Sequence, residues 1–205
     1  MKSIRQVWTI ILAIILVSVI SCVGSYESVE ILDVPLQDEM LVDPVTNFEG
    51  IVASTTELVH RELPRAWLTH FMYEGTRASL PTLNGIMHFT YIERHFGLPR
   101  DQILVGFVEV NVAEGIMALK TENHTFYDPR IEAISLPYGV ELSKLVLVAD
   151  QQIERIGIGD CYVRLLFSGA DWWVVCYPPD SDGFGEVLCD FRVDALTGEV
   201  ILDGR

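Results

Sequence analysis

Basic residues are scarce in this chain. Its 205 residues include 14 Lys and Arg against 29 Asp and Glu, which gives a formal net charge of −15. Lysine occurs at three positions, Lys2, Lys120 and Lys144. Proteins that bind nucleic acids neutralise phosphates with a basic patch or stripe. We therefore expect no nucleic-acid partner.

Long apolar runs are also rare, because residues 7–20 form the one stretch that is long enough to lie in a bilayer. A polytopic transporter is therefore excluded. GxSxG, P-loop, GxGxxG and CxxC motifs are all missing, and with them the main signatures of hydrolases, nucleotide-binding enzymes and thiol redox enzymes. Since half of the residues are hydrophobic, general disorder is excluded as well. We expect an acidic globular protein behind a membrane-directed leader.

Residues 1–22 have the layout of a secretory signal peptide. Lys2 and Arg5 precede the apolar run, and no acidic residue occurs before Cys22. The last four residues, Val19-Ile20-Ser21-Cys22, resemble the bacterial lipobox. This resemblance implies cleavage before Cys22 and attachment of a lipid to that cysteine, which would make the chain a lipoprotein.

Two other interpretations of the leader stay open. One is an uncleaved signal anchor with an incidental Cys22, and the other is ordinary signal-peptide cleavage. All three place the bulk of the chain outside the cytoplasm, because the cations of the leader stay inside. The expected localisation is extracytoplasmic and membrane-anchored, in a bacterial cell envelope.

Residues 23–50 are expected to be an acidic tether. They carry seven carboxylates and no Lys or Arg, and Pro35 and Pro44 interrupt any helix. Repulsion between these charges favours a solvated segment that holds the folded part away from the membrane. The alternative is that Val29–Val34 adds an edge strand to a sheet.

Residues 51–135 are expected to form an α+β region of unknown type. The pattern predicts helices at 51–63, 66–78 and 82–96, then a strand at 102–112 and a return strand at 116–120. The third helix depends on the three- and four-residue spacing of Ile86, Phe89, Ile92 and Phe96. On such a helix His88 and His95 would lie two turns apart, too far to chelate one ion, and we therefore expect no metal site.

Residues 137–205 have the most regular pattern. Apolar residues from 141 to 156 form one stripe of an amphipathic helix, which Gly157 ends. A two-residue turn at Gly169-Ala170 would then pair apolar residues across two strands: Val163 with Cys176, Leu165 with Val174, and Phe167 with Trp172. A turn through 195–198 would pair Val193 with Val200.

These patterns together predict the fold class α+β. An amphipathic helix packs on a four-stranded antiparallel β-meander, because each supplies the apolar cover that the other lacks. A mainly helical segment with a β-hairpin, residues 51–135, precedes this unit.

The closing hairpin carries a family resemblance. Arg192-Val193-Asp194-Ala195-Leu196-Thr197-Gly198-Glu199-Val200-Ile201 resembles the end of PepSY domains, in which a strand leads into a V-D-A-x-T-G-E-V hairpin. The preceding helix and the strand 172–177 also follow the order of that family, so the resemblance covers residues 137–205. It implies a domain of protease propeptides and envelope proteins that restrains or modulates peptidases. It also implies no catalytic residue, and we expect no cofactor.

Three cysteines, Cys161, Cys176 and Cys189, fall on the inward face in this register. Cysteines outside the cytoplasm tend to form disulfides, and adjacent antiparallel strands favour the pair Cys176–Cys189. The alternative is that all three stay reduced and pack as small hydrophobic residues.

Aromatic residues mark the outward face of the predicted meander. Tyr162, Trp173 and Tyr177 alternate with the inward residues and lie near Arg164, a composition typical of protein-binding surfaces. The alternative is that residues 51–135 fold over this face and make it a second core layer.

The expected function is that of an exported, lipid-anchored, non-catalytic module that binds an envelope protein or modulates a peptidase. Two alternatives stay open. One is an envelope enzyme with a His/carboxylate site between residues 51–135 and the C-terminal sheet. The other is a structural accessory subunit.

Overall fold

A computed structural model describes residues 28–95, 102–124, 133–134, 136, 141–167, 169–181 and 185–201. Within these ranges, no helix has both the length and the apolar character needed to cross a membrane. The predicted leader and Cys22 lie outside the described residues, so their roles stay predictions.

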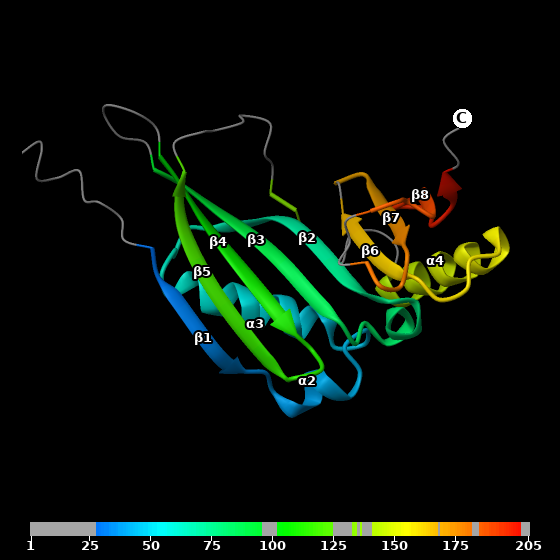
Figure 1. The fold of residues 1–205 in the computed structure, drawn as a ribbon. Helices are drawn as coiled ribbons and strands as arrows, with labels where there is room; N and C mark the ends of the chain where they lie inside the picture. The colour runs from blue at the N-terminus through cyan, green and yellow to red at the C-terminus, as the bar shows by residue number, and fades with distance from the viewer. Residues whose placement is uncertain are drawn as a thin grey trace, which may run out of the picture.

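The described residues form one nine-stranded antiparallel sheet with helices on one side (Figure 1). The strands are β1 (Glu30–Pro35), β2 (Trp67–Thr76), β3 (Ile86–His95), β4 (Gln102–Asn111), β5 (Ile116–His124), β6 (Tyr162–Phe167), β7 (Asp171–Tyr177), β8 (Cys189–Asp194) and β9 (Val200–Ile201). The helices are α2 (Asp38–Val42), α3 (Phe48–His60), the 3-10 helix η1 (Arg77–Thr82) and α4 (Leu142–Ile156). The strand order is β1-β5-β4-β3-β2-β6-β7-β8-β9.

This order divides the sheet into two similar units. In the first, α3 is followed by the meander β2-β3-β4-β5, and in the second α4 is followed by the meander β6-β7-β8-β9. The units join through their first strands, β2 and β6, which pair from Phe71↔Phe167 to Thr76↔Tyr162. We call this β2–β6 pairing the seam.

One hydrophobic core runs across the seam, between the sheet and the helices α3 and α4. Phe48 of α3 packs against Phe71 of β2 with ring centroids 5.1 Å apart, and Phe71 packs against Trp172 of β7 at 5.9 Å. All three side chains are buried. Because the two helices share this core, they cover the same face of the sheet, which we call the core face.

The stripe predicted for α4 is confirmed. Leu145, Val146, Ala149 and Ile153 are buried against the sheet, and the helix runs from Leu142 to Ile156. It ends at Gly157, whose positive φ of 83° is the left-handed conformation in which a side chain would be strained.

The helix predicted at 51–63 is present as α3, but the two helices predicted after it are wrong. Residues 66–78 form β2 and the start of η1, and most of 82–96 forms β3. Met87, Phe89 and Tyr91 point alternately into the core, and this two-residue period prevails over the three- and four-residue spacing in the same segment. Pairing on both sides, with β2 and with β4, holds β3 extended.

The predicted fold class is therefore contradicted. The four C-terminal strands are not a separate meander under one helix, because β6 pairs with β2 and continues the sheet into the first unit. The strand pairing predicted inside the C-terminal unit is nevertheless confirmed. Val163 pairs with Cys176, Phe167 with Trp172, and Val193 with Val200.

The acidic tether predicted for residues 23–50 also needs correction, because residues from Glu30 onward are folded. The alternative edge strand is present as β1, which pairs with β5 through Glu30↔Lys120. Leu36, Met40 and Phe48 are buried in the core. These apolar side chains supply the burial that outweighs repulsion among the surrounding carboxylates.

Candidate functional site: the open face of the sheet

The face of the sheet opposite α3 and α4 carries none of the described helices, and we call it the open face (Figure 1). Side chains that alternate with the core residues point to it. They include Glu74, His88, Phe107, Glu109, Lys120, Tyr162, Arg164, Trp173, Tyr177 and Asp190. The two units contribute to this surface on either side of the seam.

An ion-pair cluster lies at the seam. Glu74 of β2 stands opposite Arg164 of β6 and accepts hydrogen bonds from its Nε at 2.7 Å and its Nη2 at 2.5 Å. The other carboxylate oxygen of Glu74 accepts a hydrogen bond from Tyr162 Oη at 3.0 Å. The side chains of Glu74 and Arg164 are only 13% and 18% exposed. A paired, hydrogen-bonded charge set of this kind ties the units together and fixes the side chains on the open face.

Tyrosine side chains complete the seam cluster. Burial, followed by the hydrogen bond to Glu74 and the charge of Glu74, raises the pKa of Tyr162 far above its ordinary value, so its hydroxyl stays protonated and acts as a donor. The guanidinium of Arg164 lies 5.6 Å from the ring centroid of Tyr177, a cation–π distance.

His88 lies beside this cluster, between two carboxylates. Its Nε2 is 3.7 Å from Glu74 Oε2, and its Nδ1 is 4.0 Å from Glu109 Oε2. Nearby, burial and then the proximity of His88 lower the pKa of His70. Within the described residues, no serine, threonine or cysteine is hydrogen-bonded to His88, and no three His, Cys, Asp or Glu side chains are placed to hold a metal ion. The arrangement therefore has a potential base but no nucleophile beside it.

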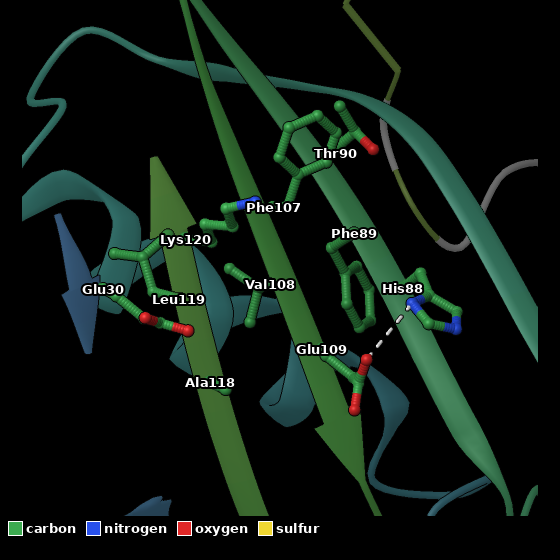
Figure 2. Close-up of a pocket in the computed structure, with 10 residues that line it drawn as sticks. All are labelled: Glu30, His88, Phe89, Thr90, Phe107, Val108, Glu109, Ala118, Leu119 and Lys120. Atoms are coloured by element: carbon green, nitrogen blue, oxygen red, sulfur yellow. Dashed lines mark ion pairs between the residues drawn. The ribbon is translucent and has the colours of Figure 1, made fainter. Parts of the chain in front are cut away.

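A hollow of about 320 Å³ opens on this face over β3, β4 and β5 (Figure 2). Phe107 and Glu109 of β4 line it together with His88 of β3, Lys120 of β5 and Glu30 of β1, and Thr90 and Ala118 also contribute. The hollow is at the lower limit of pockets for drug-sized ligands, which are roughly 300–1,000 Å³.

The charges around the hollow are partly paired. Lys120 Nζ lies 2.7 Å from Glu122 Oε1, and this ion pair raises the pKa of Lys120 and lowers that of Glu122. Glu109 is 55% exposed, and its ion-pair partner among the described residues is His88, at 4.0 Å. Two carboxylates, Glu30 and Glu109, and two basic side chains, Lys120 and His88, line the hollow.

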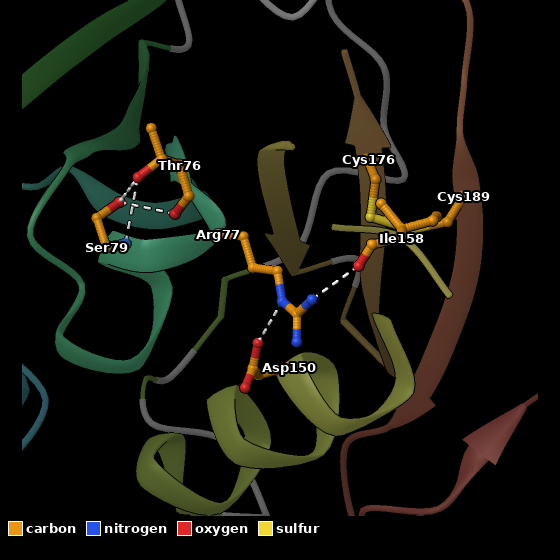
Figure 3. A network of polar contacts seen from close by, with 7 residues as sticks. All are labelled: Thr76, Arg77, Ser79, Asp150, Ile158, Cys176 and Cys189. Carbon is orange, nitrogen blue, oxygen red and sulfur yellow. Dashed lines mark hydrogen bonds and ion pairs between the residues drawn. A yellow bond between two sulfur atoms is a disulfide. The ribbon is translucent and has the colours of Figure 1, made fainter. Parts of the chain in front are cut away.

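On the core side, Arg77 joins the end of β2 to α4 (Figure 3). Its Nε donates to Asp150 at 2.7 Å and its Nη1 donates to the carbonyl oxygen of Ile158 at 2.7 Å. The hydrogen bond to Asp150 is the largest reason that the pKa of Arg77 is raised. These contacts fix the start of η1 against α4 and the residues that follow it, which is a structural role for Arg77.

The cysteines of the C-terminal unit lie on the core face. The structure joins Cys176 and Cys189 in a disulfide between β7 and β8, where the two residues are directly paired (Figure 3). Cys161 is a buried free thiol, and burial raises its pKa. A protonated, buried thiol is a poor nucleophile, so none of these three cysteines is placed for catalysis.

All four residues predicted for a partner surface lie on the open face. Trp173 is 40% exposed, whereas Tyr162, Arg164 and Tyr177 are partly buried. The described strands of residues 51–135 do not cover these four residues, because β2 to β5 extend the same sheet sideways from β6. The patterns missed Glu74 and the seam, since 66–78 was expected to be helical.

Comparison with family models, with curated proteins and with solved structures found no match to this chain. The hairpin that carries the PepSY resemblance has its own turn chemistry, since Asp194 Oδ1 accepts hydrogen bonds from the backbone of Thr197 and Leu196.

Proposed function

We propose that this chain is an exported, lipid-anchored protein of a bacterial cell envelope that binds another protein through its open face and does no chemistry on it. The observation that carries the proposal is the sheet itself. Its nine described strands bury one face under α3 and α4, and the other face exposes Trp173 in the second unit and Phe107 in the first, beside a small buried cluster of Ile92, Ile103 and Val105. Partly exposed aromatic side chains on a rigid surface are typical anchors of protein interfaces.

The edges of the sheet support recognition by side chains rather than by an added strand. At one edge β9 is two residues long. At the other, β1 has an irregular register between Ile31 and Val34, contains Asp33 at a positive φ of 57°, and ends at Pro35. Irregular, short or proline-containing edges resist pairing with another chain. Recognition through the open face is therefore the better-supported mode.

The seam cluster makes this surface rigid before any partner arrives. Glu74 already accepts hydrogen bonds from Arg164 and Tyr162, so these groups lose little freedom on binding. This preorganisation supports binding. It disfavours the alternative of an enzyme, because a carboxylate with its oxygens occupied is not available as a general base.

Export and peptidase modulation complete the proposal. The leader with Cys22 and the Cys176–Cys189 disulfide both suit an oxidising compartment outside the cytoplasm. The order of α4 followed by β6 to β9 agrees with the element order that the PepSY resemblance implies. A peptidase is therefore one class of partner to look for.

Site-specific photo-crosslinking in living cells tests the proposal. A photoreactive phenylalanine analogue would replace Trp173 in one variant and Leu147 in a control, since Leu147 is 55% exposed on α4, behind the core face. We expect a discrete protein adduct from position 173 and none from position 147. Equal adducts from both positions, or none from 173, would contradict binding through the open face.

Mass spectrometry of the mature N-terminus tests the anchor separately. We expect a lipid-modified Cys22 as the first residue. An intact Met1 or an unmodified Cys22 would reject lipidation and leave the binding proposal unaffected.

A further inference from the structure

We infer that the hollow on the open face takes a basic side chain, Arg or Lys, from the bound partner. This inference rests on the proposed function, because it names the chemistry that the open face recognises. The hollow lies over β3, β4 and β5 and is bordered by Glu30 at the β1 edge (Figure 2).

Two side chains of the hollow, Phe107 and Glu109, fit a long cationic side chain. Phe107 is 38% exposed, so part of its ring can contact a cation from a partner, and Lys120 stands directly opposite it on β5. Glu109, two residues along β4, is 55% exposed, and its carboxylate reaches no closer than 4.0 Å to His88. A guanidinium that stacks on Phe107 can therefore donate to Glu109, in the charge-assisted geometry that carboxylates favour.

The size of the hollow also favours a single long side chain as its occupant. A volume of about 320 Å³ holds one long side chain, whereas most cofactors and drug-sized ligands need the larger part of the roughly 300–1,000 Å³ range. The contributions of Thr90 and Ala118, two small side chains, leave room between the aromatic ring and the carboxylates.

The charge around the hollow favours a cation over an anion. Lys120 and His88 are the basic side chains that line it, and the ammonium of Lys120 is already paired with Glu122 at 2.7 Å. Glu30 stands directly opposite Lys120 in the strand pairing, which adds a second carboxylate. The whole chain carries −15, so a basic segment is also attracted at long range. A membrane of anionic lipids or an acidic peptide would be repelled.

Fluorescence polarisation with the full chain in detergent micelles tests the inference. The probes are fluorescein-labelled twelve-residue peptides with three arginines, the same peptide with three glutamines, and the same peptide with three glutamates. We expect binding of the arginine peptide, much weaker binding of the glutamine peptide, and none of the glutamate peptide. Equal binding of the arginine and glutamine peptides would overturn the inference.

Variants separate the hollow from general electrostatics. Glu109→Gln is expected to raise the Kd of the arginine peptide about tenfold, as the loss of a charge-assisted hydrogen bond does. Phe107→Leu keeps an apolar side chain without a ring and is expected to raise it about threefold. Glu57→Gln is the matched control, because Glu57 is exposed on α3 and pairs with Arg61. If Glu57→Gln weakens binding as much as Glu109→Gln, the inference fails.

The photo-crosslink at position 173 distinguishes this failure from that of the proposed function. If the adduct forms equally well in chains that carry Glu109→Gln or Phe107→Leu, the proposed binding through the open face stands. The inference that the hollow takes a basic side chain of the partner is then refuted. If these variants reduce the adduct while Glu57→Gln does not, both proposals are supported.

Discussion

Two adjacent tryptophans provide the sharpest test of which face of the sheet is buried. Trp172 is fully buried on the core face, with its ring 4.7 Å from Phe167 and 5.9 Å from Phe71. Its Nε1 has no hydrogen-bond partner among the described residues, so replacing it removes packing only. Trp172→Ala should cost about 3–5 kcal/mol of unfolding free energy.

Trp173 is the matched comparison, because it has the same side chain one position further along β7. It is 40% exposed on the open face, where its Nε1 donates a hydrogen bond to Asp190. Trp173→Ala should therefore cost about 1 kcal/mol, the usual contribution of one hydrogen bond.

Thermal and denaturant unfolding followed by circular dichroism measures both losses. For a protein of this size each kcal/mol lowers the Tm by about 2–4 °C. We therefore expect a decrease of roughly 6–20 °C for Trp172→Ala and roughly 2–4 °C for Trp173→Ala. Equal losses would refute the assignment of the two faces, and a larger loss for Trp173→Ala would show that another layer covers the open face. Trp172→Phe should recover most of the stability, because it keeps an aromatic ring and removes an unpaired donor.

The seam and the disulfide lead to two further predictions. Glu74→Gln should destabilise the fold by about 2 kcal/mol or more, because it removes the charge that pairs with the partly buried Arg164. Glu57→Gln is the control, because it breaks an exposed pair with Arg61, and it should cost about 0.5 kcal/mol or less in the same unfolding assay. Similar losses in both variants would contradict a structural role for the seam cluster. In denaturant without reductant, alkylation and peptide mass spectrometry should label Cys161 and leave Cys176 and Cys189 unlabelled until a reductant is added. Labelling of all three before reduction would reject the disulfide.

The sequence by itself predicted those helices and hairpins that depend on residues close together in the chain. The apolar stripe of α4 was readable because it repeats at helical spacing over four turns and ends at Gly157. The pairing of Val163 with Cys176 followed from the turn at Gly169-Ala170, since a short turn sets the register of a hairpin. In the same way, the turn at 113–115 predicted the β4–β5 hairpin.

Contacts between residues far apart in sequence were decided by the tertiary structure alone. The segment that forms β3 fits both helical and strand spacing, because its apolar residues occupy positions 86, 87, 89, 91 and 92. Pairing with β2 and β4 selects the strand, by satisfying the backbone hydrogen bonds on both edges. No local sequence pattern predicts the seam, where Arg164 donates a hydrogen bond to Glu74, a residue ninety positions earlier in the chain. The open face has the same origin. β2 and β6 are the first strands of their meanders, and each pairs with the other along the edge that its own meander leaves free. The two units therefore share one sheet instead of covering one another.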